Sequence, residues 1–303
     1  MRIGFGLPVS GSWATPERLV QVATEAERQG YDSLWTFQRL LVGADQELDP
    51  VYRSVLDPIV ALSFAAARTS TIRLGVAVVN LPFVSPAYLA KQAGTLDLLS
   101  GGRLDLGLGT GWSPAEFAAT GGSVEHRAKR VREYVAVLRT LWDDDVSSFD
   151  GDLYTVPPSR MAPKPPGPQL LLGGSVPAAL ARAGEIADGW VSRSATDLAH
   201  IHRDVELVRA GAEKAGKDPA KVRVVCRGVV RLSDQPLGAE RRRLEGSYEQ
   251  LREDAAWLAT QGVTEVFYDL NWDRRIAHPE ADPSAALDLA LEILHNLTPA
   301  GLG

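Results

Sequence analysis

Two strand-to-glycine turns are the parts of this chain whose residue types could hold a ligand. The first is Gly109-Thr110-Gly111-Trp112, which follows an alternating, strand-like run from Leu104 to Leu108. The second is Gly173-Gly174-Ser175, which follows the apolar run 170–172. Glycine brings a ligand close to bare backbone amides, and a serine hydroxyl at a helix start adds a donor for a phosphate. We predict that the two turns bind an anion or a flat cofactor ring; plain capped turns without a ligand are the alternative.

Few other side chains have a spacing that suits catalysis or metal binding. Of the five histidines, His200 and His202 are the closest pair, and residues two apart do not face each other on a helix. The single cysteine, Cys226, excludes an internal disulfide and a multi-cysteine metal site. The Gly-x-Ser-x-Gly elbow of a hydrolase is missing, and Asp273 is a lone carboxylate that suits a loop cap. The sequence therefore indicates chemistry carried by a cofactor, with no metal.

The composition is that of a globular protein with a moderate negative charge. The 303 residues are 45% hydrophobic and 23% charged, and the formal net charge is −6. This charge disfavours nucleic acid and anionic membranes as partners. We predict that Arg241-Arg242-Arg243 lies on the solvated face of a helix. The first residues form no apolar signal segment, and no stretch reaches the roughly 18 apolar residues of a membrane helix, so we predict a cytoplasmic protein.

The elements that must position the two turns alternate between strands and helices. Thr15-Pro16, Asp57-Pro58 and Ser85-Pro86 each combine a capping side chain with a first-turn proline, which predicts a helix start. The predicted strands are 3–7, 33–37, 72–79, 104–108, 169–172, 189–192, 222–230 and 265–270. Besides the helices at these three starts, the predicted helices are 114–120, 124–142, 178–186, 197–215, 248–261 and 283–297.

Eight strand–helix units without a break in composition predict an α/β fold, a (β/α)8 TIM barrel that spans residues 1–303 as a single domain. The region between the fourth and fifth strands is longer. We predict that it forms a long insertion with an irregular, proline-rich segment from Pro157 to Pro168. A doubly wound sheet in two domains is the rival, but no Gly-x-Gly-x-x-Gly turn follows the first strand. Barrel active sites lie at the carboxyl ends of the strands, where both glycine turns fall.

The end of the third predicted strand, Ala77-Val78-Val79-Asn80, lies on the same face of the barrel. Ala77 is small among bulky neighbours, so a flat ring could lie against the backbone there. The alternative, which the sequence by itself favours, is that alanine only fits the packing layers inside the barrel.

Together, these motifs resemble the luciferase-like flavin and deazaflavin oxidoreductases over nearly the whole chain. Besides the two glycine turns, the motifs that carry the resemblance are Arg2-Ile3-Gly4-Phe5, Gly30-Tyr31-Asp32-Ser33-Leu34-Trp35, Arg73-Leu74-Gly75-Val76, Ser85-Pro86, Pro163-Lys164-Pro165 and Ala187-Asp188-Gly189-Trp190. The Gly-Thr-Gly-Trp form of the first turn, and the spacing from Pro-Lys-Pro to Gly-Gly, most resemble the branch that uses coenzyme F420.

The resemblance implies an oxidoreductase that transfers a hydride between F420 and an unidentified small organic substrate, with FMN as the alternative cofactor. It implies that the cofactor lies across the strand ends, that the protein is a homodimer, and that a cis non-prolyl peptide bond, here Ala77–Val78, backs the ring. The residues that it places against the cofactor are Gln38, Ala77, Val78, Asn80, Thr110, Gly111, Trp112, Gly173, Gly174 and Ser175.

Two positions depart from the pattern of family members that oxidise sugar phosphates. Those members carry an Asp-His pair after the second strand, where this chain has Gln38-Arg39, and a glutamate after Gly-Thr-Gly, where it has Trp112. The acid and base of that reaction are therefore absent, and reduction of an activated double bond suits the chain better. We predict that Gln38 and Arg39 hold the catalytic position: Gln38 hydrogen bonds the ring, and Arg39 is either a substrate-anion clamp or a surface charge. Trp112 is expected to wall the pocket.

Four hypotheses for the function follow. The first is an F420-dependent oxidoreductase, and the nearest alternative is an FMN-dependent luciferase-like monooxygenase. A non-catalytic (deaza)flavin-binding protein is the third, because the acid–base pair is lost. The fourth is a phosphosugar barrel enzyme, which predicts that neither F420 nor FMN binds.

Overall fold

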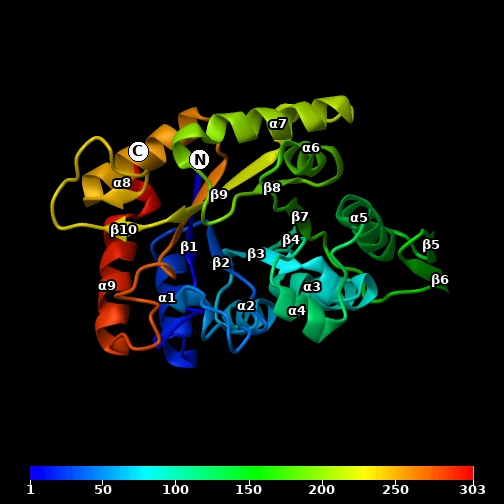
Figure 1. The fold of residues 1–303 in the computed structure, drawn as a ribbon, viewed down its shortest axis with the longest axis horizontal. Helices are drawn as coiled ribbons and strands as arrows, with labels where there is room; N and C mark the ends of the chain where they lie inside the picture. Colours follow the sequence, from blue (N-terminus) through cyan, green and yellow to red (C-terminus); the bar gives the residue numbers. More distant parts are fainter. Residues whose placement is uncertain (303) are drawn as a thin grey trace.

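The computed structural model describes residues 1–302, and its central feature is a closed barrel of eight parallel strands surrounded by helices (Figure 1). The strands meet in the order β1-β12-β9-β8-β7-β4-β3-β2. Their bounds are β1 (Arg2–Gly6), β2 (Ser33–Thr36), β3 (Arg73–Asn80), β4 (Leu104–Gly109), β7 (Gln169–Leu172), β8 (Gly189–Val191), β9 (Arg223–Val229) and β12 (Glu265–Asp269). The predicted (β/α)8 barrel is confirmed.

The helices outside the barrel begin where their capping residues predict. Thr15, Asp57 and Ser85 each accept a hydrogen bond from the backbone amide three residues on, and a proline opens each helix. The α-helices are α1 (Pro16–Arg28), α2 (Pro58–Ala66), α3 (Pro86–Ser100), α4 (Pro114–Thr120), α5 (Arg127–Asp143), α6 (Pro177–Ile186), α7 (Ile201–Lys214), α8 (Tyr248–Thr260) and α9 (Pro283–Asn296). The short 3₁₀ helices are η1 (Pro50–Tyr52), η2 (Leu81–Phe83), η3 (Leu198–His200), η4 (Pro219–Lys221) and η5 (Pro299–Leu302). Within residues 1–302, no helix is long and apolar enough to span a bilayer.

The long insertion between β4 and β7, the fourth and fifth barrel strands, contains more regular structure than the sequence predicts. Besides α4 and α5 it forms an antiparallel hairpin of β5 (Ser147–Asp150) and β6 (Thr155–Ser159), which lies beside α5 (Figure 1). The expectation of an irregular segment from Pro157 is therefore partly wrong, since an edge strand tolerates proline. Helix α5 starts at Arg127 rather than at residue 124, because His126 has a φ of 52°, outside the right-handed helical region.

The run Arg241-Arg242-Arg243 does not lie on a helix, which corrects the prediction. It belongs to the loop between β10 (Arg231–Leu232) and β11 (Glu245–Gly246), which pair with each other outside the barrel. Asp254, buried on α8, accepts hydrogen bonds from the side chains of Arg241 and Arg243. A buried carboxylate needs such partners. Because Arg241 and Arg243 both turn toward Asp254, this segment forms a loop and not a helix.

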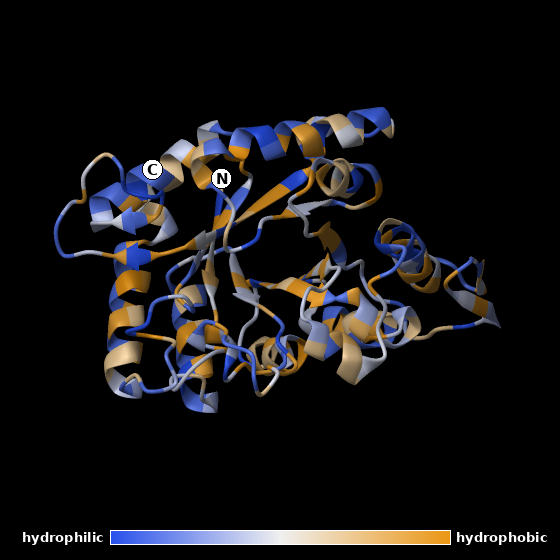
Figure 2. Ribbon diagram, viewed as in Figure 1, coloured by the Kyte–Doolittle hydropathy of each residue, from blue (hydrophilic) through white to orange (hydrophobic). Residues whose placement is uncertain are grey.

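The apolar core has two parts. One fills the space between the strands and the surrounding helices, and the other fills the barrel interior with Trp35, Ala77, Leu171, Val191, Val225 and Phe267. Ala77 thus belongs to a packing layer inside the barrel, which is the alternative that the sequence by itself favours for it. The rings of Trp35 and Phe267 stack with centroids 4.9 Å apart. Figure 2 shows the central strands mostly in the hydrophobic colour, whereas the outer helix α7 is largely hydrophilic. This pattern matches parallel strands that are covered on both faces.

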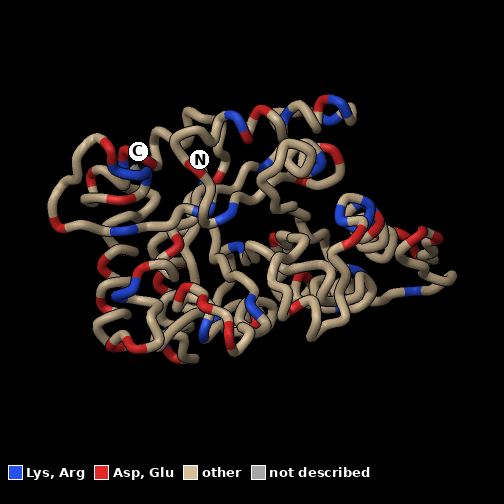
Figure 3. The backbone as a smooth tube through the Cα atoms, viewed as in Figure 1, with Lys and Arg blue, Asp and Glu red and all other residues tan. Residues whose placement is uncertain are grey.

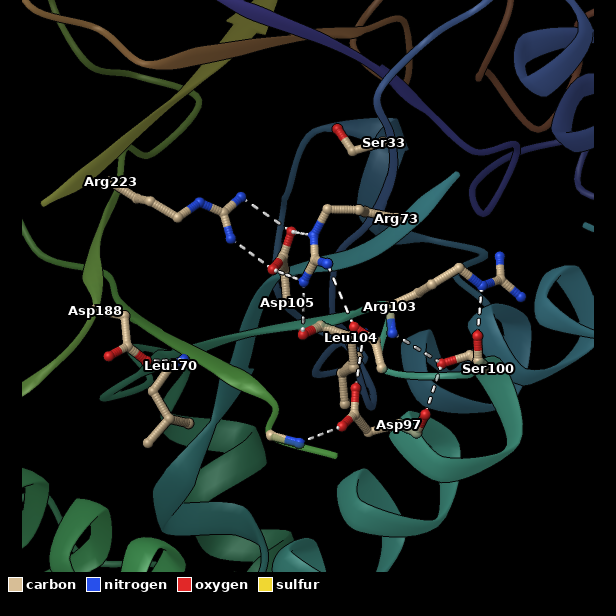
Figure 4. Close-up of polar contacts among 12 residues, drawn as sticks. Ser33, Arg73, Asp97, Ser100, Arg103, Leu104, Asp105, Leu170, Asp188 and Arg223 are labelled. Carbon is tan, nitrogen blue, oxygen red and sulfur yellow. Dashed lines mark hydrogen bonds and ion pairs between the residues drawn. The ribbon is translucent and has the colours of Figure 1, made fainter. Parts of the chain in front are cut away.

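Buried ion pairs close the amino-terminal end of the barrel (Figure 4). Asp105 of β4 accepts hydrogen bonds from Arg223 of β9, at 2.5 and 2.9 Å, and from Arg73 of β3, at 2.6 and 3.0 Å. Glu265 of β12 accepts from Arg223 at 2.8 Å and from Ser33 of β2 at 2.6 Å. Burial raises the pKa of Asp105, but the hydrogen bonds and charges of the two arginines outweigh it, so this pKa lies below its ordinary value.

Candidate active site

A bulge interrupts β3 at Ala77 and Val78, toward the carboxyl-terminal end of the barrel, and its backbone is called the floor below. The pairing of β3 with β4 shifts between Val76 and Val79, and the Ala77–Val78 peptide bond is cis, as the resemblance implies. Gly109 of β4 faces the bulge, and a Cβ atom there would lie 2.4 Å from Val78 Cγ2. This glycine of the sequence motif is therefore required by the close approach of the two strands, a role that the sequence analysis missed.

Arg227 of β9 holds the floor from the opposite side of the barrel. Its Nη1 group donates to the carbonyl oxygen of Ala77 at 3.1 Å, and its Nε group donates to Asp269 Oδ2 at 2.7 Å. The guanidinium also lies over the ring of Phe37, 4.8 Å from the centroid. The sequence analysis missed Arg227 and Asp269, although an arginine inside the apolar run 222–230 is a signal that could have identified the first.

Gln38 and Asn80 link the ends of β2, β3 and β4. The backbone amide of Asn80 donates to Gln38 Oε1 at 2.8 Å, and that of Gly111 donates to Asn80 Oδ1 at 3.0 Å. The carbonyl oxygen of each side chain thus accepts a hydrogen bond from the backbone. The amide nitrogens, Gln38 Nε2 and Asn80 Nδ2, donate to no acceptor within residues 1–302. Two amide donors remain for a ligand at this edge of the barrel, next to Thr110.

Arg39 forms a buried ion pair, so the interpretation of it as a surface charge is wrong. Its Nη1 group lies 2.7 Å from Glu116 Oε2, and the two side chains are 3% and 1% exposed. Glu116 Oε1 also accepts from the backbone amide of Leu40 at 2.8 Å. The sequence analysis missed Glu116, which fixes α4 over the loop that follows β2. The anion-clamp role of Arg39 stays a prediction, and the Glu116 pair weighs against it.

Aromatic rings surround Arg39 at the barrel mouth. Its guanidinium carbon lies 4.5 Å from the centroid of Tyr52 and 4.4 Å from that of Trp112, an arrangement in which both ring faces attract the cation. Tyr52 packs edge to face on Trp112 and on Trp272, with centroids 5.9 and 5.5 Å apart. Burial raises the pKa of Tyr52. Trp112 therefore belongs to an aromatic wall, together with two residues that the sequence analysis did not select.

The second glycine turn, at the end of β7, keeps some of its donors free. The amide of Gly173 donates to the Leu108 carbonyl at 2.8 Å and extends the strand ladder, so it is not available to a ligand. The amides of Gly174 and Ser175 donate to no backbone carbonyl or side chain within residues 1–302. Val176, rather than Ser175, is the capping residue of α6, which leaves the exposed Ser175 hydroxyl free. The turn thus retains two amides and a hydroxyl in the arrangement expected of an anion cradle.

A cavity of about 1170 Å³ opens over the ends of β8, β9 and β12. Arg227, Tyr52 and Trp272 line it, as do residues 194–199 and residues of the β10–β11 loop. None of the glycine-turn residues lines it. The structure thus brings Gln38, Ala77, Val78, Asn80 and the two glycine turns to one end of the barrel, with the cavity in a neighbouring sector of that end.

The fold and this end of the barrel define the class of protein: a (β/α)8 barrel with ligand-binding features at the carboxyl ends of its strands. The profile of the family described as luciferase-like monooxygenase matches residues 3–298. The chain belongs to this family, whose members include enzymes that use F420 or a flavin.

Curated relatives match part of the chain. A 5,10-methylenetetrahydromethanopterin reductase from Methanolobus tindarius is 31% identical over 207 residues, 68% of this chain and 59% of the relative. An F420-dependent glucose-6-phosphate dehydrogenase from Amycolatopsis mediterranei is 30% identical over 220 residues, 70% of this chain and 64% of the relative. An uncharacterized protein from Mycobacterium tuberculosis is 35% identical over 188 residues, 59% of this chain and 65% of the relative. The chain spans less than two thirds of the length of each of these relatives.

Solved structures share the whole fold at low sequence identity. A monooxygenase from Streptomyces bottropensis superposes with a TM-score of 0.81 and 21% identity, covering 99% of both chains. An F420-dependent secondary alcohol dehydrogenase superposes with a TM-score of 0.79 and 18% identity, covering 100% of this chain and 99% of the other. At such identities the likeness establishes the fold.

Proposed function

We propose that this protein is an F420-dependent oxidoreductase that acts on a small organic substrate. One curated relative, the glucose-6-phosphate dehydrogenase from Amycolatopsis mediterranei, is F420-dependent by name and supports the choice of cofactor, and the family supports an oxidoreductase. The observation that carries the proposal is the backbone floor at Ala77–Val78, with unused donors on its rim from Gln38, Asn80 and the Gly174-Ser175 turn.

The residues present suit a planar cofactor with an anionic tail. Gly109 makes room for the Val78 side chain at the floor, since a Cβ atom there would lie 2.4 Å from Val78 Cγ2 and 3.1 Å from Asn80 Oδ1. Gln38 and Asn80 would hold the ring by its polar edge, and the amides of Gly174 and Ser175 would hold a phosphate. A bound deazaflavin supplies hydride transfer, and the protein contributes orientation.

The carboxylates at the barrel mouth explain why we favour reduction of an activated double bond. Glu116 is paired with Arg39 and Asp269 with Arg227, each at 2.7 Å. Each of these carboxylates is thus committed to an arginine rather than to a substrate hydroxyl. Alcohol oxidation needs a base at the reacting hydroxyl, whereas reduction of an activated double bond asks less of the protein.

An FMN-dependent monooxygenase is the second candidate, favoured by the likeness of the whole fold to the Streptomyces bottropensis monooxygenase. A fluorescence titration of the purified chain with oxidised F420 and with FMN tests both. We expect submicromolar binding of F420 and at least tenfold weaker binding of FMN. The reverse preference, followed by oxygen uptake with reduced FMN, would establish the monooxygenase. Binding of neither cofactor would contradict both.

Gly174→Ala tests the cradle. Gly174 has a φ of 142°, and an added Cβ would lie 2.7 Å from Ala179 Cβ, so the turn must shift and its amides would no longer converge. We expect F420 binding to weaken about tenfold, the loss of one charge-assisted hydrogen bond. Gly216→Ala is the matched control, because Gly216 also has a positive φ, 72°, but has no atom within 4 Å of an added Cβ.

We also propose a homodimer, as the family resemblance implies, a single domain, as the eight strand–helix units indicate, and a cytoplasmic location, as the composition of the sequence predicts. Exposed apolar side chains on α2 and α3, among them Val60, Tyr88 and Leu99, are suited to an interface. Sedimentation velocity would test the homodimer, and fractionation of the source cells would test the location.

A further inference from the structure

The cavity beside the proposed cofactor site has an aromatic inner end and a basic outer end. Tyr52 and Trp272 line the inner end, above Arg227. Arg231 and Arg241, Arg242 and Arg243 line the outer part, against the two carboxylates Asp197 and Glu245. The arginine-rich loop joins β10 to β11, near the β10 label of Figure 1, where Figure 3 shows basic segments close to acidic ones.

Two of these arginines share one buried carboxylate of the protein. Asp254 pairs with Arg241 and with Arg243, and its backbone-facing oxygen accepts from the Leu244 amide at 2.7 Å. Arg243 also lies over the ring of Trp257, 4.1 Å from its centroid. Burial raises the pKa of Asp254, but the hydrogen bonds of Arg241 and Arg243 outweigh it and the pKa is lowered. These contacts anchor the loop on α8. Because the side chains of Arg241 and Arg243 are engaged with Asp254, we do not assign them to a ligand.

Arg242 and Arg231 are the two arginines of the outer end that do not pair with Asp254. The Arg242 side chain makes no hydrogen bond or ion pair within residues 1–302, while Arg241 Nη1 donates to its backbone carbonyl at 3.3 Å and holds it in the loop. Arg231 Nε lies 3.6 Å from Glu245 Oε1, beyond the length of a good hydrogen bond. Arg231 on β10 and Arg242 on the anchored loop thus present two cations with spare donors to the cavity.

The inner end of the cavity adjoins the floor at Ala77–Val78. Arg227 lines the cavity and also donates to the Ala77 carbonyl at 3.1 Å, so one side chain touches both places. Because Asp269 already neutralises Arg227, the inner end presents aromatic faces rather than a free charge. A ligand that filled the cavity would place an apolar or aromatic part next to the floor and its far end beside Arg231 and Arg242.

We infer that this cavity binds an anionic substrate, whose phosphate or carboxylate contacts Arg242 and Arg231 and whose apolar or aromatic body lies against Tyr52 and Trp272. The inference names the substrate class of the proposed oxidoreductase and rests on that function. Arginine suits such groups because its planar donors match the oxygens of a phosphate or carboxylate.

Calorimetric titration of the full chain with 2-naphthyl phosphate and with 2-naphthol tests the inference without turnover. We expect the phosphate to bind at least tenfold more tightly than the alcohol at low salt, and less tightly as salt screens the arginines. Arg242→Gln and Arg231→Gln should each weaken phosphate binding about fivefold and leave 2-naphthol unchanged. Arg68→Gln is the matched control, since Arg68 is exposed and precedes β3 at the other end of the barrel.

Equal binding of the two probes, or full phosphate binding by the Arg242→Gln/Arg231→Gln double variant, would overturn the inference. The anion in the cavity could belong to the substrate or to the tail of F420, so the titration is repeated with F420 bound. If 2-naphthyl phosphate still binds, the cavity is a substrate site. If F420 prevents its binding, the cavity holds the tail of the cofactor. Failure of the proposed function gives a different result, because F420 and FMN would then not bind although the arginine-dependent phosphate binding remained.

Discussion

The two ends of the barrel both contain buried arginine–carboxylate pairs, but the pairs are arranged differently. At the amino-terminal end, Asp105 binds two arginines (Figure 4), and Arg223 binds the two carboxylates Asp105 and Glu265. At the carboxyl-terminal end, within residues 1–302, Arg39 pairs with one carboxylate, Glu116, and Arg227 pairs with one carboxylate, Asp269. The buried Nε groups of Arg39 and Arg223, one at each end, have no partner within residues 1–302, so the ends differ in their carboxylates and in the free amide donors of Gln38 and Asn80. The comparison indicates that one end is a closed structural plug, whereas the other keeps donors for a ligand.

Asp105→Ala should have the largest effect on stability. It would leave the half-buried Arg73 and the buried Arg223 without their shared carboxylate, and breaking a buried pair costs about 3–5 kcal/mol of unfolding free energy. Urea denaturation followed by circular dichroism measures this cost. Asp45→Ala, at an exposed position, is the control and should change the stability by less than about 0.5 kcal/mol.

If Asp105→Ala lowered the unfolding free energy no more than Asp45→Ala does, the amino-terminal ion pairs of Asp105 would not stabilise the fold. The folded variant should also bind F420 with unchanged affinity, because Asp105 lies at the other end of the barrel. A loss of affinity without a loss of stability would contradict the division of roles between the two ends.

Glu116→Gln should cost about 3 kcal/mol, because it leaves the charge of Arg39 buried with only Tyr52 and Trp112 around it. Unlike Asp105→Ala, it should also weaken F420 binding, since Glu116 fixes α4 at the barrel mouth. The double variant Arg39→Met/Glu116→Leu removes both charges and should recover most of the stability. If the double variant were as unstable as Glu116→Gln, the two side chains would stabilise the fold by more than the compensation of their charges.

Acid should destabilise the protein through the amino-terminal plug. The pKa of Asp105 is lowered in the folded state, so its contribution is present above the ordinary carboxyl pKa of about 4 and is lost as the pH falls below it. We expect the unfolding free energy of the wild type to decrease more steeply below pH 4 than that of Asp105→Asn. Parallel pH profiles from urea titrations would contradict this account.

Gln38→Ala should have the smallest effect on stability and a selective effect on the cofactor. It removes one hydrogen bond to the Asn80 amide, worth about 1 kcal/mol, and one donor at the proposed ring edge. We expect F420 binding to weaken about tenfold in the fluorescence titration. Gln29→Ala, at the end of α1, removes a hydrogen bond to Glu25 at the protein's other end and should leave the affinity unchanged.

Local signals in the sequence predict the fold well. Capping side chains before Pro16, Pro58 and Pro86 place helix starts, and apolar runs place the barrel strands, because both depend on contacts within a few residues. The errors lie where distant groups override the local pattern. Asp254 draws the arginine run out of a helix, and the hairpin of β5 and β6 forms from a segment rich in proline.

The sequence by itself determined the eight strand–helix units, the two glycine turns and the resemblance that places the cis bond at Ala77–Val78. Only the tertiary structure decided which side chains meet at the barrel ends. Arg227 reaches Ala77 across 150 residues of chain, and Arg39 reaches Glu116 across 77. Such contacts depend on the closure and register of the barrel, which no short stretch of sequence encodes.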